Sequence, residues 1–194
     1  MILDVLVERP TKQTTKYLLN FSVLLIVIAV PLVIIPLELS NFAGTLDETQ
    51  LGFNGDYIKS MFSLMSNEEI LMFFLGNLFD YVFIVGYGSF IFSTALSLTR
   101  KLKIGSLWNK IGFLIAIFGI ISAICDGIEN IFLFLMVLNP TNFPTWLGIP
   151  HSSFALMKFL LMYLTMGWII LTAFFLLISK LIKRNSLNKF EVSD

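Results

Sequence analysis

The chain has 194 residues, of which 57% are hydrophobic and only 13% are charged, and its thirteen Lys plus Arg residues balance thirteen Asp plus Glu residues. The charged share is about half that of a typical soluble domain, and a soluble fold of this size could not bury twenty Phe together with several long apolar runs. This composition argues against a soluble enzyme, a nucleic-acid-binding protein and a disordered chain. The lone cysteine, Cys125, excludes an internal disulfide and a cysteine-cluster metal site. We therefore expect an integral membrane protein.

Four segments are long and apolar enough to cross a bilayer, for which a helix needs about 20 residues. The first follows basic residues, as a signal peptide would, but its apolar stretch is longer than that of a signal peptide and no cleavage-site pattern follows it. Pro31 and Pro36 predict a kink or early unwinding in this first span. The sequence thus predicts an all-α protein, in which residues 1–194 form one membrane domain, a four-transmembrane-helix bundle. Its expected spans are residues 17–37, 70–98, 111–138 and 154–182.

Positive charge is distributed unevenly between the connecting segments. The segments before span one, between spans two and three, and after span four hold eleven Lys or Arg residues, whereas the two opposite loops hold only Lys59. Cytoplasmic segments of membrane proteins carry the excess of Lys and Arg. We therefore expect a multi-pass protein of the plasma or cytoplasmic membrane with both termini cytoplasmic.

The two outer loops differ in their local signals. Residues 38–67 carry apolar side chains at helical spacing between Ile58 and Met65, which predicts a short amphipathic helix lying on the membrane or on the bundle. Residues 66–69 fit a capping box at the start of the second span. The later loop, residues 139–153, contains three prolines, and we expect no continuous helix there.

Four ionisable residues fall inside the predicted spans: Asp80 in the second, Asp126 and Glu129 in the third, and Lys158 in the fourth. Charge at membrane depth is costly, so such residues usually face the bundle interior and mark a functional site. A helical rise of about 1.5 Å per residue brings all four into the outer half of the bilayer. Because three acids and one base do not all stay charged in a dry site, we expect at least one carboxyl to be protonated, ion-paired or cation-bound.

Helical periodicity adds polar neighbours to these four residues. Asp126, Glu129 and Asn130 have i, i+3 and i+4 spacing and therefore share one helix face. The chain contains no metal-ligand spacing of a recognised type and no nucleotide-binding or hydrolase motif, so we predict neither a metal nor a cofactor. The predicted pocket is lined by Asn77, Asp80, Tyr87, Asp126, Glu129, Asn130 and Lys158, and its mouth by His151, Ser152 and Ser153.

The stretch 125–130, with the letters CDGIEN, carries a resemblance. Together with Asp80 and Lys158, it resembles a set of small four-helix integral membrane proteins that share a D-x-x-E-N motif in the third span. The resemblance implies a four-span fold in which these positions act together. It implies no activity.

Three function classes remain open. The first is binding or transport of a proton, a small cation or a cationic amphiphile, and transport would need a homodimer for alternating access. The second is an intramembrane isomerase or hydrolase acting on a lipid, with Glu129 or Asp126 as general acid or base and Lys158 as electrostatic stabiliser. The third is a structural or accessory subunit in which the polar cluster only sets helix packing. We rank binding or transport first, and we expect membrane lipids, but no nucleic acid, among the partners.

Overall fold

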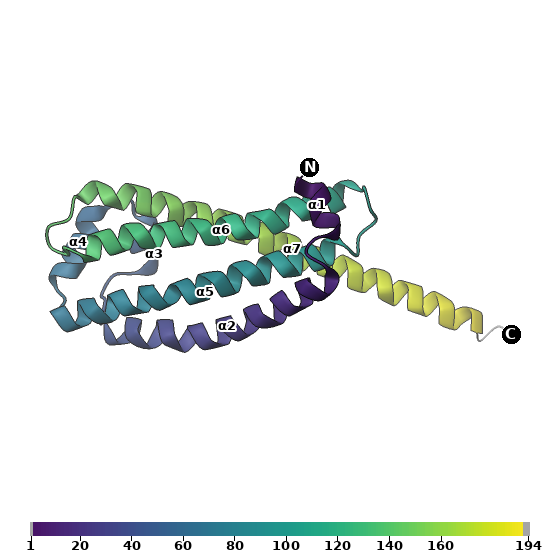
Figure 1. Ribbon diagram of the computed structural model, residues 1–194, viewed down its shortest axis with the longest axis horizontal. Coiled ribbons are helices and arrows are strands. Elements are labelled where there is room, and N and C mark those ends of the chain that lie inside the picture. Colours follow the sequence, from purple (N-terminus) through teal and green to yellow (C-terminus); the bar gives the residue numbers. More distant parts are fainter. Residues whose placement is uncertain (1, 192–194) are drawn as a thin grey trace.

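The computed structural model describes residues 2–191 and the side chains of residues 5–45 and 47–183. It is all-helical, and four of its helices are long and apolar enough to cross a membrane (Figure 1). Each covers nearly all of one segment that the sequence predicts, so the four-helix prediction is confirmed. The long helices are α2 (Lys12–Leu39), α5 (Asn67–Thr99), α6 (Leu107–Val137) and α7 (Gly148–Glu191).

The long helices pack in chain order: α2 lies along α5, α5 along α6, and α6 along α7. Helix α1 (Ile2–Glu8) and the α5–α6 connection lie at one end of the bundle, and the C-terminal part of α7 projects beyond that same end (Figure 1). The opposite end is closed by α3 (Leu46–Leu51), α4 (Gly55–Ser63) and the short 3₁₀ helix η1 (Thr145–Leu147). The first and last described residues, Ile2 and Glu191, therefore lie at the same end of the bundle.

Two proline-containing segments differ in part from the sequence predictions. Helix α2 does not unwind early, because it stays helical through Pro31 and Pro36 to Leu39; a proline removes one backbone donor, and the rest of the ladder persists. The fourth long helix begins at Gly148 rather than at residue 154. Pro150 lies in its first turn, where the missing N–H has no helical partner to lose, so the helix continues through the segment that the sequence assigned to a loop.

The predicted amphipathic helix is present as α4. The Asn54 side chain caps it by accepting hydrogen bonds from the backbone N–H groups of Asp56 and Tyr57, each at 3.1 Å. Its apolar residues Ile58 and Phe62 are fully buried against the ends of the long helices. The apolar face of α4 therefore packs on the bundle. The predicted capping box of residues 66–69 is also present, at the start of α5.

A side-chain hydrogen bond links α3 to α4. Tyr57 of α4 donates a hydrogen bond of 2.7 Å to the Glu48 carboxylate of α3, and the Thr45 hydroxyl donates a second of 2.8 Å. These two bonds hold the pKa of the Glu48 carboxyl below its ordinary value. The sequence did not predict α3, which places Gln50 next to the ends of α2 and α5.

Glycine permits one close approach of two backbones at this end. A Cβ atom on Gly55 would overlap the carbonyl oxygen of Thr145, and a Cβ on Gly148 would lie 2.5 Å from the Gly55 nitrogen. Neither neighbour is a flexible side chain that could move aside. The contact between α4 and the start of α7 therefore depends on two residues without side chains.

We predict that Gly55→Ala lowers the free energy of unfolding by about 1–3 kcal/mol, the usual cost of overpacking. Gly167→Ala is the matched control, because a Cβ there meets nothing within 4 Å; in a helix this change should stabilise by about 0.5–1 kcal/mol. Thermal unfolding of the purified variants in neutral detergent measures both. Equal stability of the two variants would contradict the close packing at Gly55.

Candidate functional site

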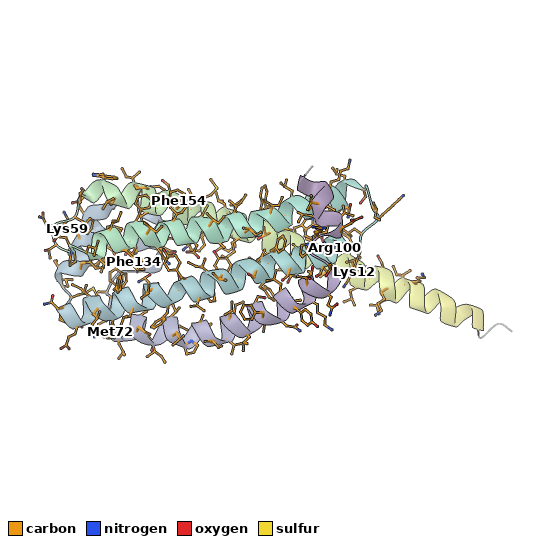
Figure 2. The ribbon with its side chains drawn as sticks, viewed as in Figure 1. Lys12, Lys59, Met72, Arg100, Phe134 and Phe154 are labelled. Carbon is orange, nitrogen blue, oxygen red and sulfur yellow. The ribbon has the colours of Figure 1, made fainter. Side chains whose placement is uncertain are left out.

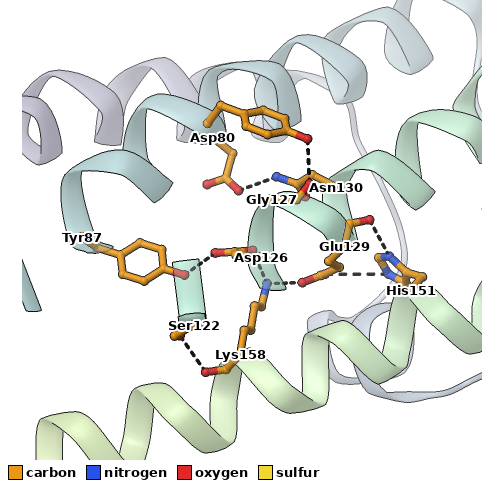
Figure 3. A network of polar contacts seen from close by, with 10 residues as sticks. Asp80, Tyr87, Ser122, Asp126, Gly127, Glu129, Asn130, His151 and Lys158 are labelled. Carbon is orange, nitrogen blue, oxygen red and sulfur yellow. Dashed lines mark hydrogen bonds and ion pairs between the residues drawn. The ribbon is translucent and has the colours of Figure 1, made fainter. Parts of the chain in front are cut away.

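A buried lysine bridges two of the three carboxylates that the sequence singled out. The Lys158 ammonium lies 2.8 Å from Oδ1 of Asp126 and 2.5 Å from Oε2 of Glu129 (Figure 3). Asp126 and Glu129 are three residues apart on α6, so they project from one face and a single cation reaches both. Lys158 is ten residues from the start of α7, roughly 15 Å along the helix. It therefore lies farther from the end of the helix than the predicted start at residue 154 implies.

Asp126, Glu129 and Lys158 are here called the ion cluster, and Asp126 also joins this cluster to α5. Its second carboxylate oxygen, Oδ2, accepts a hydrogen bond of 2.9 Å from the Tyr87 hydroxyl. One turn away on α6, the Ser122 hydroxyl donates a 2.9 Å bond to the backbone carbonyl of Lys158. The side chains of Asp126, Glu129 and Lys158 are at most 9% exposed, so these contacts tie three helices together away from water.

Asp80 lies on the same cavity as Asp126 and Lys158 but makes no ion pair with Lys158. Its carboxylate is half-buried and accepts a 2.8 Å hydrogen bond from the amide of Asn130. In the part of the chain that the structure describes, no cationic side chain lies within ion-pair distance of Asp80. Asp126 and Glu129 each pair with the Lys158 ammonium, whereas the hydrogen-bond partner of Asp80 is a neutral amide.

The three residues predicted at the pocket mouth lie in the first turns of α7. His151 is fully buried, with Nδ1 at 3.3 Å from the Glu129 carbonyl oxygen and Nε2 at 3.9 Å from Oε1 of Glu129. Ser152 is also buried and accepts a bond from the backbone N–H of Phe53 at 3.0 Å. Ser153 is exposed and bonds to the Ile149 carbonyl of its own helix. His151 thus extends the buried cluster, whereas the two serines do not line the pocket.

A cavity of about 690 Å³, here called the large cavity, lies beside the ion cluster and is bordered by all four long helices. Six of the seven predicted pocket residues line it, and Glu129 is the exception. The cavity reaches the lateral surface of the bundle, where Tyr163 is 67% exposed and Met166 is 36% exposed. Its other apolar walls are Val33 and Leu37 on α2, Phe83, Phe90 and Ile91 on α5, and Phe159 and Met162 on α7.

A smaller cavity of about 230 Å³ lies toward the end closed by α3 and α4. It shares Leu37, Gln50 and Asn77 with the large cavity, and His151 lines its wall. The sequence does not predict that Gln50 lines a cavity, because nothing in its local pattern indicates that α3 packs against the long helices. Its carbonyl oxygen Oε1 is buried without a hydrogen-bond partner in the described residues.

Comparison with known proteins finds no matching family model, no similar curated protein and no similar solved structure. Among the described residues, no three His, Cys, Asp or Glu side chains are arranged to hold a metal ion. The chemistry of the site therefore follows from its own geometry. Lys158 is shared by two carboxylates, and beside them lies a largely apolar cavity with a third carboxylate, Asp80, that has no cation within ion-pair distance among the described residues.

We predict that Lys158→Met lowers the free energy of unfolding by about 3–5 kcal/mol, because it leaves two buried carboxylates without their cation. Adding Glu129→Gln to this variant should recover part of the loss, since it removes one of the uncompensated charges. Lys180→Met is the control: this residue is exposed on α7, and its change should stay within about 0.5 kcal/mol. Thermal unfolding in neutral detergent distinguishes these outcomes, and equal losses for Lys158→Met and Lys180→Met would contradict the role of the ion cluster.

Proposed function

We propose that the chain is a multi-pass membrane protein with both termini on the cytoplasmic side. The four apolar helices support this location, as do large exposed apolar side chains along them, such as Phe21, Ile170 and Phe174, which water would not favour. Lys12 and Arg100 lie at the end of the bundle that holds the chain termini, and Lys59 lies at the opposite end (Figure 2). The positively charged end is then the cytoplasmic one.

Within that membrane, we propose that the large cavity binds a cationic amphiphile. The observation that carries this proposal is the Asp80 carboxylate, which lines an otherwise largely apolar cavity and has no cationic partner in the described residues. A ligand cation would neutralise Asp80, and the aromatic ring of Phe83, which also lines the cavity, suits a cationic group. The apolar part of the ligand would occupy the lateral side of the cavity, between α2 and α7, and reach it from the lipid.

The residues that line the cavity favour an amphiphile over a bare metal ion. A hard cation such as Ca²⁺ takes six to eight oxygen ligands at about 2.3–2.6 Å, whereas most residues that line the large cavity are apolar. Asp126 and Glu129 already share Lys158, so a ligand cation would compete there with a buried ion pair. Asp80 offers negative charge without that competition.

The test is the affinity of the purified chain for an alkyltrimethylammonium ion in neutral nanodiscs. We expect Asp80→Asn to weaken binding about tenfold to a hundredfold, the range of a charge-assisted contact worth about 1.5–3 kcal/mol. Glu68→Gln makes the same change of charge on an exposed residue at the start of α5 and should leave the affinity unchanged. An uncharged alkyl glycoside of the same chain length should bind far more weakly to the wild type.

Two results would reject the proposal. Unchanged affinity in Asp80→Asn would show that this carboxylate does not contact the cation. An equal loss in Glu68→Gln would show that only the overall charge of the protein matters.

A further inference from the structure

A second polar hollow lies at the other end of the bundle, far along α5 from the large cavity. It has a volume of about 250 Å³ and is called here the basic hollow. Lys12 and Arg100, which contribute to it, lie beside each other at the end where the chain begins (Figure 2). The hollow is lined by Lys12 and Thr15 of α2, Ser97 of α5, and Arg100 and Lys101, which follow α5.

Arg100 is held rigidly in the wall of this hollow. Its guanidinium donates hydrogen bonds to the backbone carbonyls of Leu6, at 2.9 and 3.3 Å, and Pro10, at 2.7 Å, and to the Thr15 hydroxyl, at 3.2 Å. All of these acceptors are neutral. Burial lowers the pKa of Arg100, yet a guanidinium remains charged at neutral pH. The hollow therefore contains a fixed positive charge with no carboxylate partner among the side chains that the structure describes.

Two further cations border the same space. Lys12 and Lys101 are exposed, and neither makes an ion pair or side-chain hydrogen bond in the described part of the chain. The Ser97 hydroxyl is likewise without a partner there. No acidic residue lines the hollow. A ligand with several anionic oxygens would meet one hydrogen-bonded guanidinium, two exposed ammonium groups and one hydroxyl.

We propose that the basic hollow binds the phosphate group of an anionic phospholipid in the cytoplasmic leaflet. The inference rests on the proposed membrane location and orientation, and it is independent of what the large cavity holds. The hollow lies where α2 begins and α5 ends, which is the level of the headgroups for helices that span a bilayer. Anionic lipids are concentrated in that leaflet, and basic pockets between helices bind their headgroups. Free phosphate shares this chemistry, so the test separates the two sources.

The experiment measures retention of phosphatidylglycerol against phosphatidylcholine by native mass spectrometry of the full chain, released from nanodiscs that contain both lipids. The test variant changes Lys12 and Lys101 to Gln and keeps Arg100, whose bonds hold the start of the chain. At about 1 kcal/mol per basic residue, the double change should reduce the preference for phosphatidylglycerol about thirtyfold. The control pair, Lys103→Gln with Lys110→Gln, removes the same charge from residues that do not line the hollow.

Each outcome decides the proposal. Loss of the preference in the test pair, with the control pair and Asp80→Asn like the wild type, supports a lipid phosphate site whatever the large cavity binds. An equal loss in both pairs overturns it, because general attraction to the anionic surface then explains the preference. If inorganic phosphate displaces phosphatidylglycerol from the wild type and also binds in detergent without lipid, the ligand is free phosphate, and the lipid assignment is overturned.

Discussion

A lysine ammonium held between two carboxylates fixes how three helices of this bundle face one another. Because Asp126 and Glu129 project from one face of α6, the Lys158 side chain must point at that face, and this sets the rotation of α7 about its axis. The hydrogen bond from Tyr87 to Asp126 carries the same constraint to α5. A buried charge without its partner is strongly unfavourable, so alternative rotations of α7 are excluded more sharply than apolar packing alone would exclude them.

The large cavity follows from this arrangement. Helix α7 packs along α6, and α2 packs along α5. The cavity beside the ion cluster lies between these helices and is bordered by all four. The ion cluster consists of side chains that are at most 9% exposed and that pair with one another. Its role in this account is to hold the helices together. Asp80 lies on the same cavity and keeps a neutral partner, Asn130. Under the proposed function, the polar cluster serves packing through its ion pairs and binding through Asp80.

The sequence was sufficient wherever a local pattern determines the structure. Hydropathy predicts the four long helices, and i, i+3 spacing predicts that Asp126 and Glu129 share a face. The missed features depend on contacts between distant segments. The three prolines of residues 139–153 predict a loop that includes His151, although Pro150 in the first turn of α7 leaves the helix intact. That Lys158 pairs with Asp126 and Glu129 while Asp80 bonds Asn130 depends on helix rotation, which no local pattern determines.

The central claim is that Asp80 differs from Asp126 and Glu129 in two ways: no cation among the described residues lies within ion-pair distance of it, and it lines a largely apolar cavity. The most direct measurement is labelling of the chain in nanodiscs with an apolar carbodiimide, followed by mass spectrometry of each modified carboxyl. We predict modification at Asp80, suppressed by an alkyltrimethylammonium ion, with little at Asp126 or Glu129 because their ion pairs with Lys158 protect them. Equal modification of all three carboxyls, or modification of Glu129 ahead of Asp80, would contradict the account.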